Sequence, residues 1–207
     1  SGKKMIAIIN YGLGNLTSIL NMHRRLGIDA IITNKEEEIR TAHKLILPGV
    51  GHFNKGMENL QESGLQQLLN EEVLQKEKPI LGICLGAQLM TQQSEEASVE
   101  GLCWVDAETI AFDKNKMNGL KVPHMGRADI TIKDGNPLWA GLTTNPRFYH
   151  VHTYHFKFDV EDEISATAHY GYEFACAFRK KNIYGTQFHP EKSHRFGMQL
   201  LQNFAAL

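Results

Sequence analysis

Residues 79–88 read Pro-Ile-Leu-Gly-Ile-Cys-Leu-Gly-Ala-Gln and contain the pattern that decides the fold. The apolar run over 79–83 predicts a buried strand, and a helix is expected over 87–92. Cys84 stands at the corner, with a glycine two positions away on each side. This is the nucleophile-elbow pattern with Cys in place of Ser. In so tight a turn, a Cβ at Gly82 or Gly86 would clash with neighbouring backbone.

The elbow would expose the sulfur of Cys84 at the carboxyl end of a sheet, above the N-terminus of a helix. The helix dipole favours thiolate over thiol there, and the backbone N–H of Leu85 would point toward an oxyanion formed on an attacked carbonyl. The alternative is a buried structural cysteine, which is the usual role of Cys in an apolar run. The flanking glycines favour catalysis. Cys103 and Cys176 have no such context, and we expect both in the core.

The first half of the chain alternates short apolar strands with amphipathic helices. Strands are predicted over 5–9, 29–33 and 44–47, and helices over 15–26 and 53–75, the latter with a break at Gly64. Repeated strand–helix units imply parallel pairing with right-handed crossovers. The expected fold class is therefore α/β, a doubly wound, mainly parallel, flavodoxin-like sheet with helices on both faces.

The second half lacks this alternation and contains short strand candidates separated by turns. They are 122–124, 129–132, 148–151, 164–169, 174–178 and 183–188, followed by a helix over 194–204. These strands predict antiparallel additions to the sheet. No repeat or Pro/Gly-rich linker interrupts the sequence, so we expect one domain over residues 1–207.

Composition sets bounds on function. The 207 residues carry 22 basic and 23 acidic side chains, a formal net charge of −1. Such balance offers no electrostatic footprint for nucleic acid or an anionic membrane, and no apolar run approaches the length of a membrane span. Three cysteines argue against a disulfide framework and for a reducing, cytoplasmic setting.

A cysteine nucleophile needs a base, and His189 is the candidate at the end of the 183–188 strand. Pro190 stiffens the turn that follows, and Glu191 is close enough in sequence to bind one ring nitrogen, leaving the other for the thiol. Any one of 10 histidines is more often a surface residue in a turn. The combination with a cysteine elbow favours a Cys-His-Glu triad.

A second loop could complete an oxyanion hole. Gly49, Val50 and Gly51 follow the 44–47 strand, and two glycines around one residue allow a flipped peptide whose N–H points into a site. By itself this pattern is a common loop.

Two other classes of function have weaker support. Gly12-Leu13-Gly14 follows a strand, but Thr17 occupies the place of the third glycine of a dinucleotide fingerprint. His150 and His152 would share a strand face, while His155 has the opposite parity. We interpret them as polar strand-end histidines, so the sequence predicts neither a metal nor a cofactor.

At these residues the sequence resembles the class I (triad) glutamine amidotransferases, whose hallmark is Gly-x-Cys-x-Gly-x-Gln with a downstream His-Pro-Glu. More closely, it is similar to the glutaminase subunits of imidazole glycerol phosphate synthase. Four further stretches support that likeness, and they occur in the family's order: residues 11–16, 47–51, 121–126 and 148–154.

The resemblance implies a triad of Cys84, His189 and Glu191 acting on L-glutamine, with Gly51 and Gln88 binding the substrate. It also implies a heterodimer with a (β/α)8-barrel synthase subunit that receives ammonia. The residues expected near that interface are Tyr11, Asn15, Met125, Arg127, Tyr149 and Lys192.

Three departures leave the partner open. Residues 127–129 are Arg-Ala-Asp where the family usually has Trp-Asn-Gln, Asn10 replaces a typical Asp, and Ala87 a typical Met. Histidine biosynthesis is one expectation, and a paralogue serving a synthase of surface amidino-sugars is the other. A free-standing γ-glutamyl hydrolase or cysteine peptidase would not need Gln88 or the interface motifs.

Overall fold

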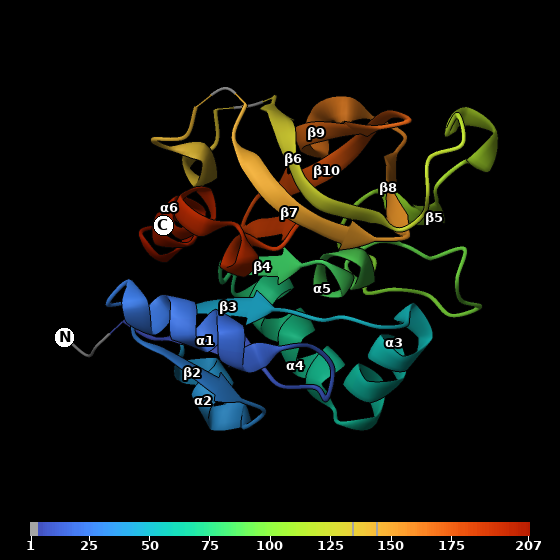
Figure 1. Ribbon diagram of the computed structural model, residues 1–207. Coiled ribbons are helices and arrows are strands. Elements are labelled where there is room, and N and C mark those ends of the chain that lie inside the picture. Colours follow the sequence, from blue (N-terminus) through green and yellow to red (C-terminus); the bar gives the residue numbers. More distant parts are fainter. Residues whose placement is uncertain (1–3, 134, 144) are drawn as a thin grey trace.

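The computed structural model describes residues 4–133, 135–143 and 145–207. Across these residues, eleven strands form one mixed sheet in the order β2-β1-β3-β4-β11-β10-β9-β6-β7, with β8 pairing to β10 and β5 to β8. Figure 1 shows the N-terminal strands and their helices below, and the C-terminal strands curving above them. The predicted mixed α/β sheet is confirmed.

The parallel half comprises β1 (Ile6–Ile9), β2 (Ala30–Thr33), β3 (Lys44–Leu47), β4 (Ile80–Ile83) and β11 (Ile183–Thr186). Four of these five strands are buried along their whole length, which explains their continuous apolar runs. The sequence placed each of them within two residues at either end.

Helices cover both faces of the parallel half, as its alternating side chains require. Their bounds are α1 (Leu16–Arg25), α2 (Glu36–Thr41), α3 (Phe53–Glu62), α4 (Leu65–Asn70), the π-helical turn η1 (Glu71–Gln75), α5 (Leu85–Leu89) and α6 (His194–Ala205). The expected break in the 53–75 helix falls at Gly64, whose φ of +76° ends α3 and begins α4. Helix α2 was not predicted.

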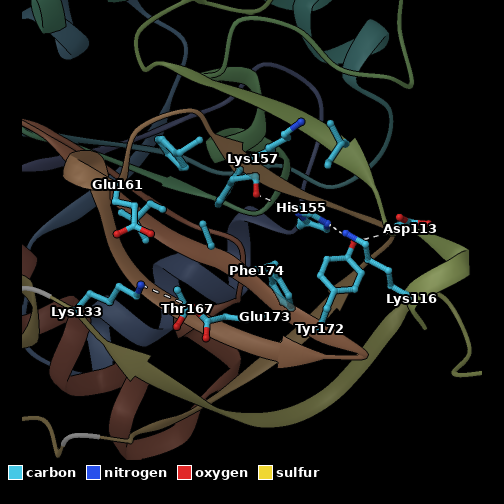
Figure 2. A pocket seen from close by; sticks show the side chains of 15 residues that line it. Asp113, Lys116, Lys133, His155, Lys157, Glu161, Thr167, Tyr172, Glu173 and Phe174 are labelled. Atoms are coloured by element: carbon cyan, nitrogen blue, oxygen red, sulfur yellow. Dashed lines mark hydrogen bonds and ion pairs between the residues drawn. The ribbon is translucent and has the colours of Figure 1, made fainter. Parts of the chain in front are cut away.

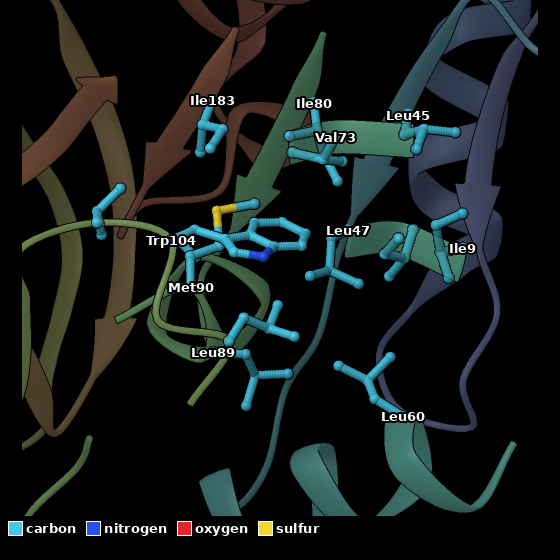
Figure 3. Packing of buried hydrophobic residues seen from close by; sticks show 14 of the residues in the cluster. Ile9, Leu45, Leu47, Leu60, Val73, Ile80, Leu89, Met90, Trp104 and Ile183 are labelled. Carbon is cyan, nitrogen blue, oxygen red and sulfur yellow. The ribbon is translucent and has the colours of Figure 1, made fainter. Parts of the chain in front are cut away.

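Two apolar cores result, one on each face. Ile9, Leu45 and Leu47 pack on the α3–α4 side, and Figure 3 shows this core around the indole of Trp104. Ile8 and Ile46, one residue out of phase, pack with α1 and α6 on the other side. Period-two alternation along each strand therefore feeds two separate clusters.

The antiparallel half comprises β5 (Ala107–Ala111), β6 (His124–Ile132), β7 (Arg147–His152), β8 (Tyr154–Phe158), β9 (Ile164–Tyr170) and β10 (Tyr172–Lys180). Four 3₁₀ turns connect elements here: η2 (Lys114–Lys116), η3 (Pro137–Trp139), η4 (Glu161–Glu163) and η5 (Pro190–Lys192).

The sequence missed two of these strands and divided a third. The expected strands 122–124 and 129–132 are wrong in their bounds, because β6 is continuous from His124 to Ile132. Its middle carries Gly126 and exposed polar residues, which hide the pattern of a strand. β5 and β8 pair with each other. In β8 the aromatic residues Tyr154, Phe156 and Phe158 alternate with polar ones, a short strand pattern that the prediction did not include.

The cysteine expectations divide. Cys176 is buried within β10, as predicted, whereas the core placement of Cys103 is wrong because that side chain is exposed. Its neighbours Leu102 and Trp104 point inward, so Cys103 points out, with a φ of +57°. Among the described residues, no helix is both long and apolar enough to cross a membrane.

Candidate active site

Cys84 lies in a strained turn between β4 and α5. Its φ of +53° and ψ of −114° are sparsely populated by residues with a side chain. A Cβ on Gly86 would stand 1.8 Å from the carbonyl oxygen of Leu47, and one on Gly82 would be 2.8 Å from Cα of Ala87. The predicted elbow, and the reason for both glycines, are confirmed by this packing.

His189 reaches the elbow because β11 pairs in parallel with β4. The backbone N–H of Cys84 donates to Thr186 at the end of β11 (2.8 Å), so both strands end at the same edge. The backbone N–H of His189 donates to Tyr149 (2.9 Å), and Ser193 donates its hydroxyl to the carbonyl of His189. His189 is thus positioned by β7, which is distant in sequence, and by the turn that directly follows it.

The ring of His189 lies between the sulfur and a carboxylate. Nδ1 is 3.2 and 3.3 Å from the two carboxylate oxygens of Glu191, and both side chains are buried. Burial alone would lower the pKa of His189, but interactions with Cys84 and Glu191 raise it to about 10. Nε2 is buried without a formed hydrogen bond, which leaves it for the thiol. The three predicted triad residues come together.

A cavity of about 480 Å³ opens beside Cys84. The predicted substrate-binding residues Gly51 and Gln88 both line it, together with Glu96 and Tyr154. Its volume suits a small ligand of amino-acid size. Cys84 forms one wall of the cavity, so a bound carboxamide would be within reach of the sulfur.

Three polar residues of this region escaped the sequence analysis. Gln187 donates from Nε2 to the sulfur of Cys84 (3.7 Å) and accepts at Oε1 from Nε2 of Gln88 (3.1 Å). Glu96 and His52, from separate loops, contact each other at the cavity. Gln187 precedes His189 by two residues, a usable signal, whereas the loop positions of Glu96 and His52 gave none.

The oxyanion prediction needs correction for this conformation. The backbone N–H of Leu85, expected to face the site, donates to the carbonyl oxygen of Gly49 (3.1 Å). The preceding carbonyl, of Pro48, accepts from the hydroxyl of Tyr11 (2.6 Å). Peptide carbonyls therefore occupy the position where donors were predicted, while Val50 at the tip is 43% exposed.

Most predicted interface residues lie on one accessible surface. Asn15, Arg127 and Lys192 are exposed, Tyr149 is half-buried, and Met125 is 63% exposed, which is high for a large apolar side chain. The Lys192 ammonium stands over the ring of Tyr149, 5.8 Å from its centroid. Tyr11 differs, because it is buried and offers little surface; burial and the nearby Cys84 raise its pKa.

A second cavity, of about 430 Å³, lies between β8, β9 and β10, away from Cys84 (Figure 2). Its floor is apolar, and Lys116, Lys133 and Glu173 stand around it. Lys133 and Glu173 pair at 3.8 Å, so cation and anion offset each other there. None of the three triad residues lines this cavity.

Comparison with known proteins agrees with this geometry. The family model of class I glutamine amidotransferases matches residues 7–207. The chain is 50% identical to "Imidazole glycerol phosphate synthase subunit HisH 2" of Methanococcus maripaludis over 97% of its length and 98% of that protein. It is 44% identical to the protein of the same name from Pseudomonas aeruginosa, over 98% and 100%.

The fold is likewise similar to that of a solved glutamine amidotransferase, with a TM-score of 0.75 and 18% identity over 97% of this chain and 99% of that one. At that identity the likeness concerns the fold alone. The family match, however, runs from β1 to the last residue and includes both strand ends that bring Cys84 and His189 together. The chain therefore belongs to the class I glutamine amidotransferase family and is an enzyme of that family.

Proposed function

We propose that this chain is the glutaminase subunit of a two-subunit imidazole glycerol phosphate synthase in histidine biosynthesis, acting as one domain over residues 1–207 in the cytoplasm. It would hydrolyse L-glutamine and pass the ammonia to a (β/α)8-barrel synthase subunit. The observation that carries the pathway is the identity of 50% and 44% to full-length relatives that have this name.

The chemistry follows from the triad. The sulfur of Cys84 attacks the carboxamide carbon of glutamine, and His189 gives its proton to the departing ammonia, which leaves a glutamyl thioester. His189 then takes a proton from water, whose oxygen attacks the thioester and releases glutamate. Glu191 orients the ring and favours its charged form, consistent with the raised pKa of His189.

The substrate's charges suggest how the cavity holds it. Glu96 is the acidic residue lining the cavity beside Cys84, and it would pair with the α-ammonium of glutamine, displacing His52. Gln88, held by Gln187, would fix the other end of the substrate. Tyr154 also lines this cavity.

Ammonia needs a way out that avoids protonation by bulk water. A small space of about 10 Å³, room for about one small molecule, touches His189 and shares Val50 with the glutamine cavity. Asn15, Val50 and Lys192 line it, and two of these belong to the predicted interface. We propose that ammonia leaves here and that the barrel subunit covers this surface.

The oxyanion hole would form only when the partner docks. Turning the peptide that joins Gly49 and Val50 would remove the carbonyl from Leu85 and present N–H groups to the substrate. Hydrolysis that is equally fast with and without the partner would contradict this step.

A second candidate is a paralogue that serves a barrel synthase in surface amidino-sugar biosynthesis. Methanococcus maripaludis has two such relatives, named HisH 2 and HisH 1, which are 50% and 42% identical to this chain. Arg127, Ala128 and Asp129 also replace the aromatic-containing stretch expected at the interface, and Asp129 pairs with Arg147 at 3.1 Å.

Co-expression with each candidate barrel subunit would separate the two. We expect one subunit to co-purify and to stimulate glutamate release when its own acceptor is added. Met125→Asp should weaken that complex but leave the fold unchanged, because Met125 is exposed. Stimulation by the sugar-pathway synthase alone would contradict the histidine assignment while leaving the glutaminase intact.

A further inference from the structure

Three buried histidines meet next to the catalytic cavity without a role in the triad. His124 lies at the start of β6, and His150 and His152 are on β7, which pairs with it. One ring nitrogen from each lies within 4.8 Å of the other two. In the part of the chain that the structure describes, this is the one group of three or more such side chains placed to hold a metal ion.

Two of the nitrogen–nitrogen distances match those of a tetrahedral metal site. Nε2 of His152 is 3.3 Å from Nδ1 of His124 and 3.2 Å from Nδ1 of His150. Nitrogen ligands at 2.0–2.1 Å from a zinc ion in tetrahedral geometry stand about 3.3 Å apart. His155 is not part of the group, because its two nitrogens bind the backbone of Phe156 and the hydroxyl of Tyr172.

Hydrogen-bond accounting shows why three neutral rings alone fit poorly. Nδ1 of His152 donates to the carbonyl of Tyr154 (2.7 Å), so its Nε2 has one lone pair. Both other histidines direct Nδ1 at that single lone pair. Only one of those two Nδ1 atoms can donate to it, whereas an ion between the rings would accept a lone pair from all three; Nε2 of His150 is buried without a partner in either case.

The rings are nevertheless in the state that metals require. Burial lowers the pKa of His124 to about 4 and, together with the neighbouring charges of His124 and His189, that of His150 to about 3. The pKa of His152 also lies well below its ordinary value, mainly through burial. Neutral imidazole is the ligand form, so no proton competes with an ion at neutral pH.

The surroundings provide support for such an ion. The Tyr154 carbonyl fixes the tautomer and orientation of His152, as outer-shell acceptors do in zinc sites. The rings of His124 and His150 stack with centroids 4.5 Å apart, so aiming both lone pairs at one ion requires these two rings to tilt. Since His152 also lines the glutamine cavity, a fourth ligand could be a water from that side.

We propose that His124, His150 and His152 form a zinc-binding site that ties β6 to β7 beside the catalytic cavity. Three imidazoles without a thiolate or a carboxylate suit Zn²⁺ better than Mg²⁺ or Ca²⁺, which prefer oxygen ligands. The ion would stabilise the hairpin whose outer surface carries Met125 and Arg127. It is distinct from the triad and takes no part in glutamine hydrolysis.

The test uses the full chain in a Cys84→Ala background, because the catalytic thiol could itself bind zinc. After treatment with a chelator, ZnCl₂ is titrated calorimetrically, and CoCl₂ provides an absorption spectrum that reports tetrahedral nitrogen ligation. We expect one Zn²⁺ per chain, and a melting temperature raised by about 5 °C or more at a hundredfold excess over Kd.

His124→Asn, His150→Asn and His152→Gln should each weaken binding by more than the roughly 10–100-fold that losing an outer-shell partner costs. His169→Asn, which alters an exposed histidine, is the matched control and should bind as the parent does. Circular dichroism without metal identifies any variant that fails to fold, and zinc binding is then judged on the variants that do fold. No zinc binding, or binding that survives all three replacements, would overturn the proposal.

Discussion

The triad and the Gly49–Gly51 loop both lie at the cavity beside Cys84, but they are held in different ways. Cys84 is fixed by close packing, since its two flanking glycines leave no room for a single added carbon. The Gly49–Gly51 loop is held by two hydrogen bonds, from the N–H of Leu85 to the Gly49 carbonyl and from the hydroxyl of Tyr11 to the Pro48 carbonyl. Val50, at the tip of the loop, is exposed. Each such bond contributes about 1 kcal/mol net. The nucleophile is therefore preformed, whereas the oxyanion hole can be switched.

The largest effect should come from the nucleophile itself. Cys84→Ala should reduce glutamine hydrolysis by about 1,000-fold or more, because no other group can form the thioester. Glutamate release in the presence of the partner measures this, and Cys103→Ala, which alters an exposed thiol, should retain full activity. Retained hydrolysis in the Cys84 variant would mean that another residue is the nucleophile.

The next largest effect is expected from the close packing of the elbow. Gly86→Ala should lower the free energy of unfolding by about 3 kcal/mol or more, because its Cβ would overlap the carbonyl of Leu47. Urea denaturation measures the change. Gly135→Ala, with no atom within 4 Å of the added carbon, should stay within about 0.5 kcal/mol. Equal stability of the two variants would show that the elbow tolerates strain.

The electrostatics of the triad predict a shift in pH dependence. Interactions with Cys84 and Glu191 outweigh burial and raise the pKa of His189 to about 10, so wild-type kcat/KM should decline only as pH rises toward that value. The same proton contributes stability that is complete below pH 6.5 and is lost as pH rises through about 10. Glu191→Gln removes one raising interaction and should move the alkaline limb to lower pH by about one unit.

A profile of kcat/KM against pH, recorded for both proteins in complex with the partner, tests this shift. An alkaline limb at the same pH in both would show that Glu191 does not stabilise the imidazolium.

The smallest effect is expected at the Gly49–Gly51 loop. Tyr11→Phe removes the hydrogen bond to Pro48 and should cost about 1 kcal/mol of stability. Because this bond holds the Gly49–Gly51 loop in the conformation without an oxyanion hole, its loss should raise glutaminase activity in the absence of the partner about fivefold. Tyr170→Phe, which removes a hydroxyl bonded to the Lys121 carbonyl away from the sulfur, is the control and should leave that activity unchanged. An unaltered rate without the partner in Tyr11→Phe would mean that the hydrogen bond from Leu85 alone holds the Gly49–Gly51 loop.

How much the sequence could predict depended on whether a signal was local. The parallel strands and the break at Gly64 were predictable, because buried apolar runs and glycine punctuation act within a few residues. β8 also carries a local signal, because Tyr154, Phe156 and Phe158 alternate with polar residues, but so short a strand was not predicted. The exposed position of Cys103 also depended on which neighbours pointed inward.

The sequence by itself determined the elbow, because the strained turn at Cys84 and the close approach of Gly82 to Ala87 involve residues a few positions apart, whereas the contact of Gly86 with Leu47 is made only in the folded sheet. It also indicated a base in the His189–Glu191 pair through their spacing. Only the tertiary structure decided that β11 lies beside β4 and that the Gly49 carbonyl accepts the hydrogen bond from the N–H of Leu85. It also decided that His124 lies close to His150 and His152. These are contacts between segments far apart in the chain, which form only when the whole sheet is assembled.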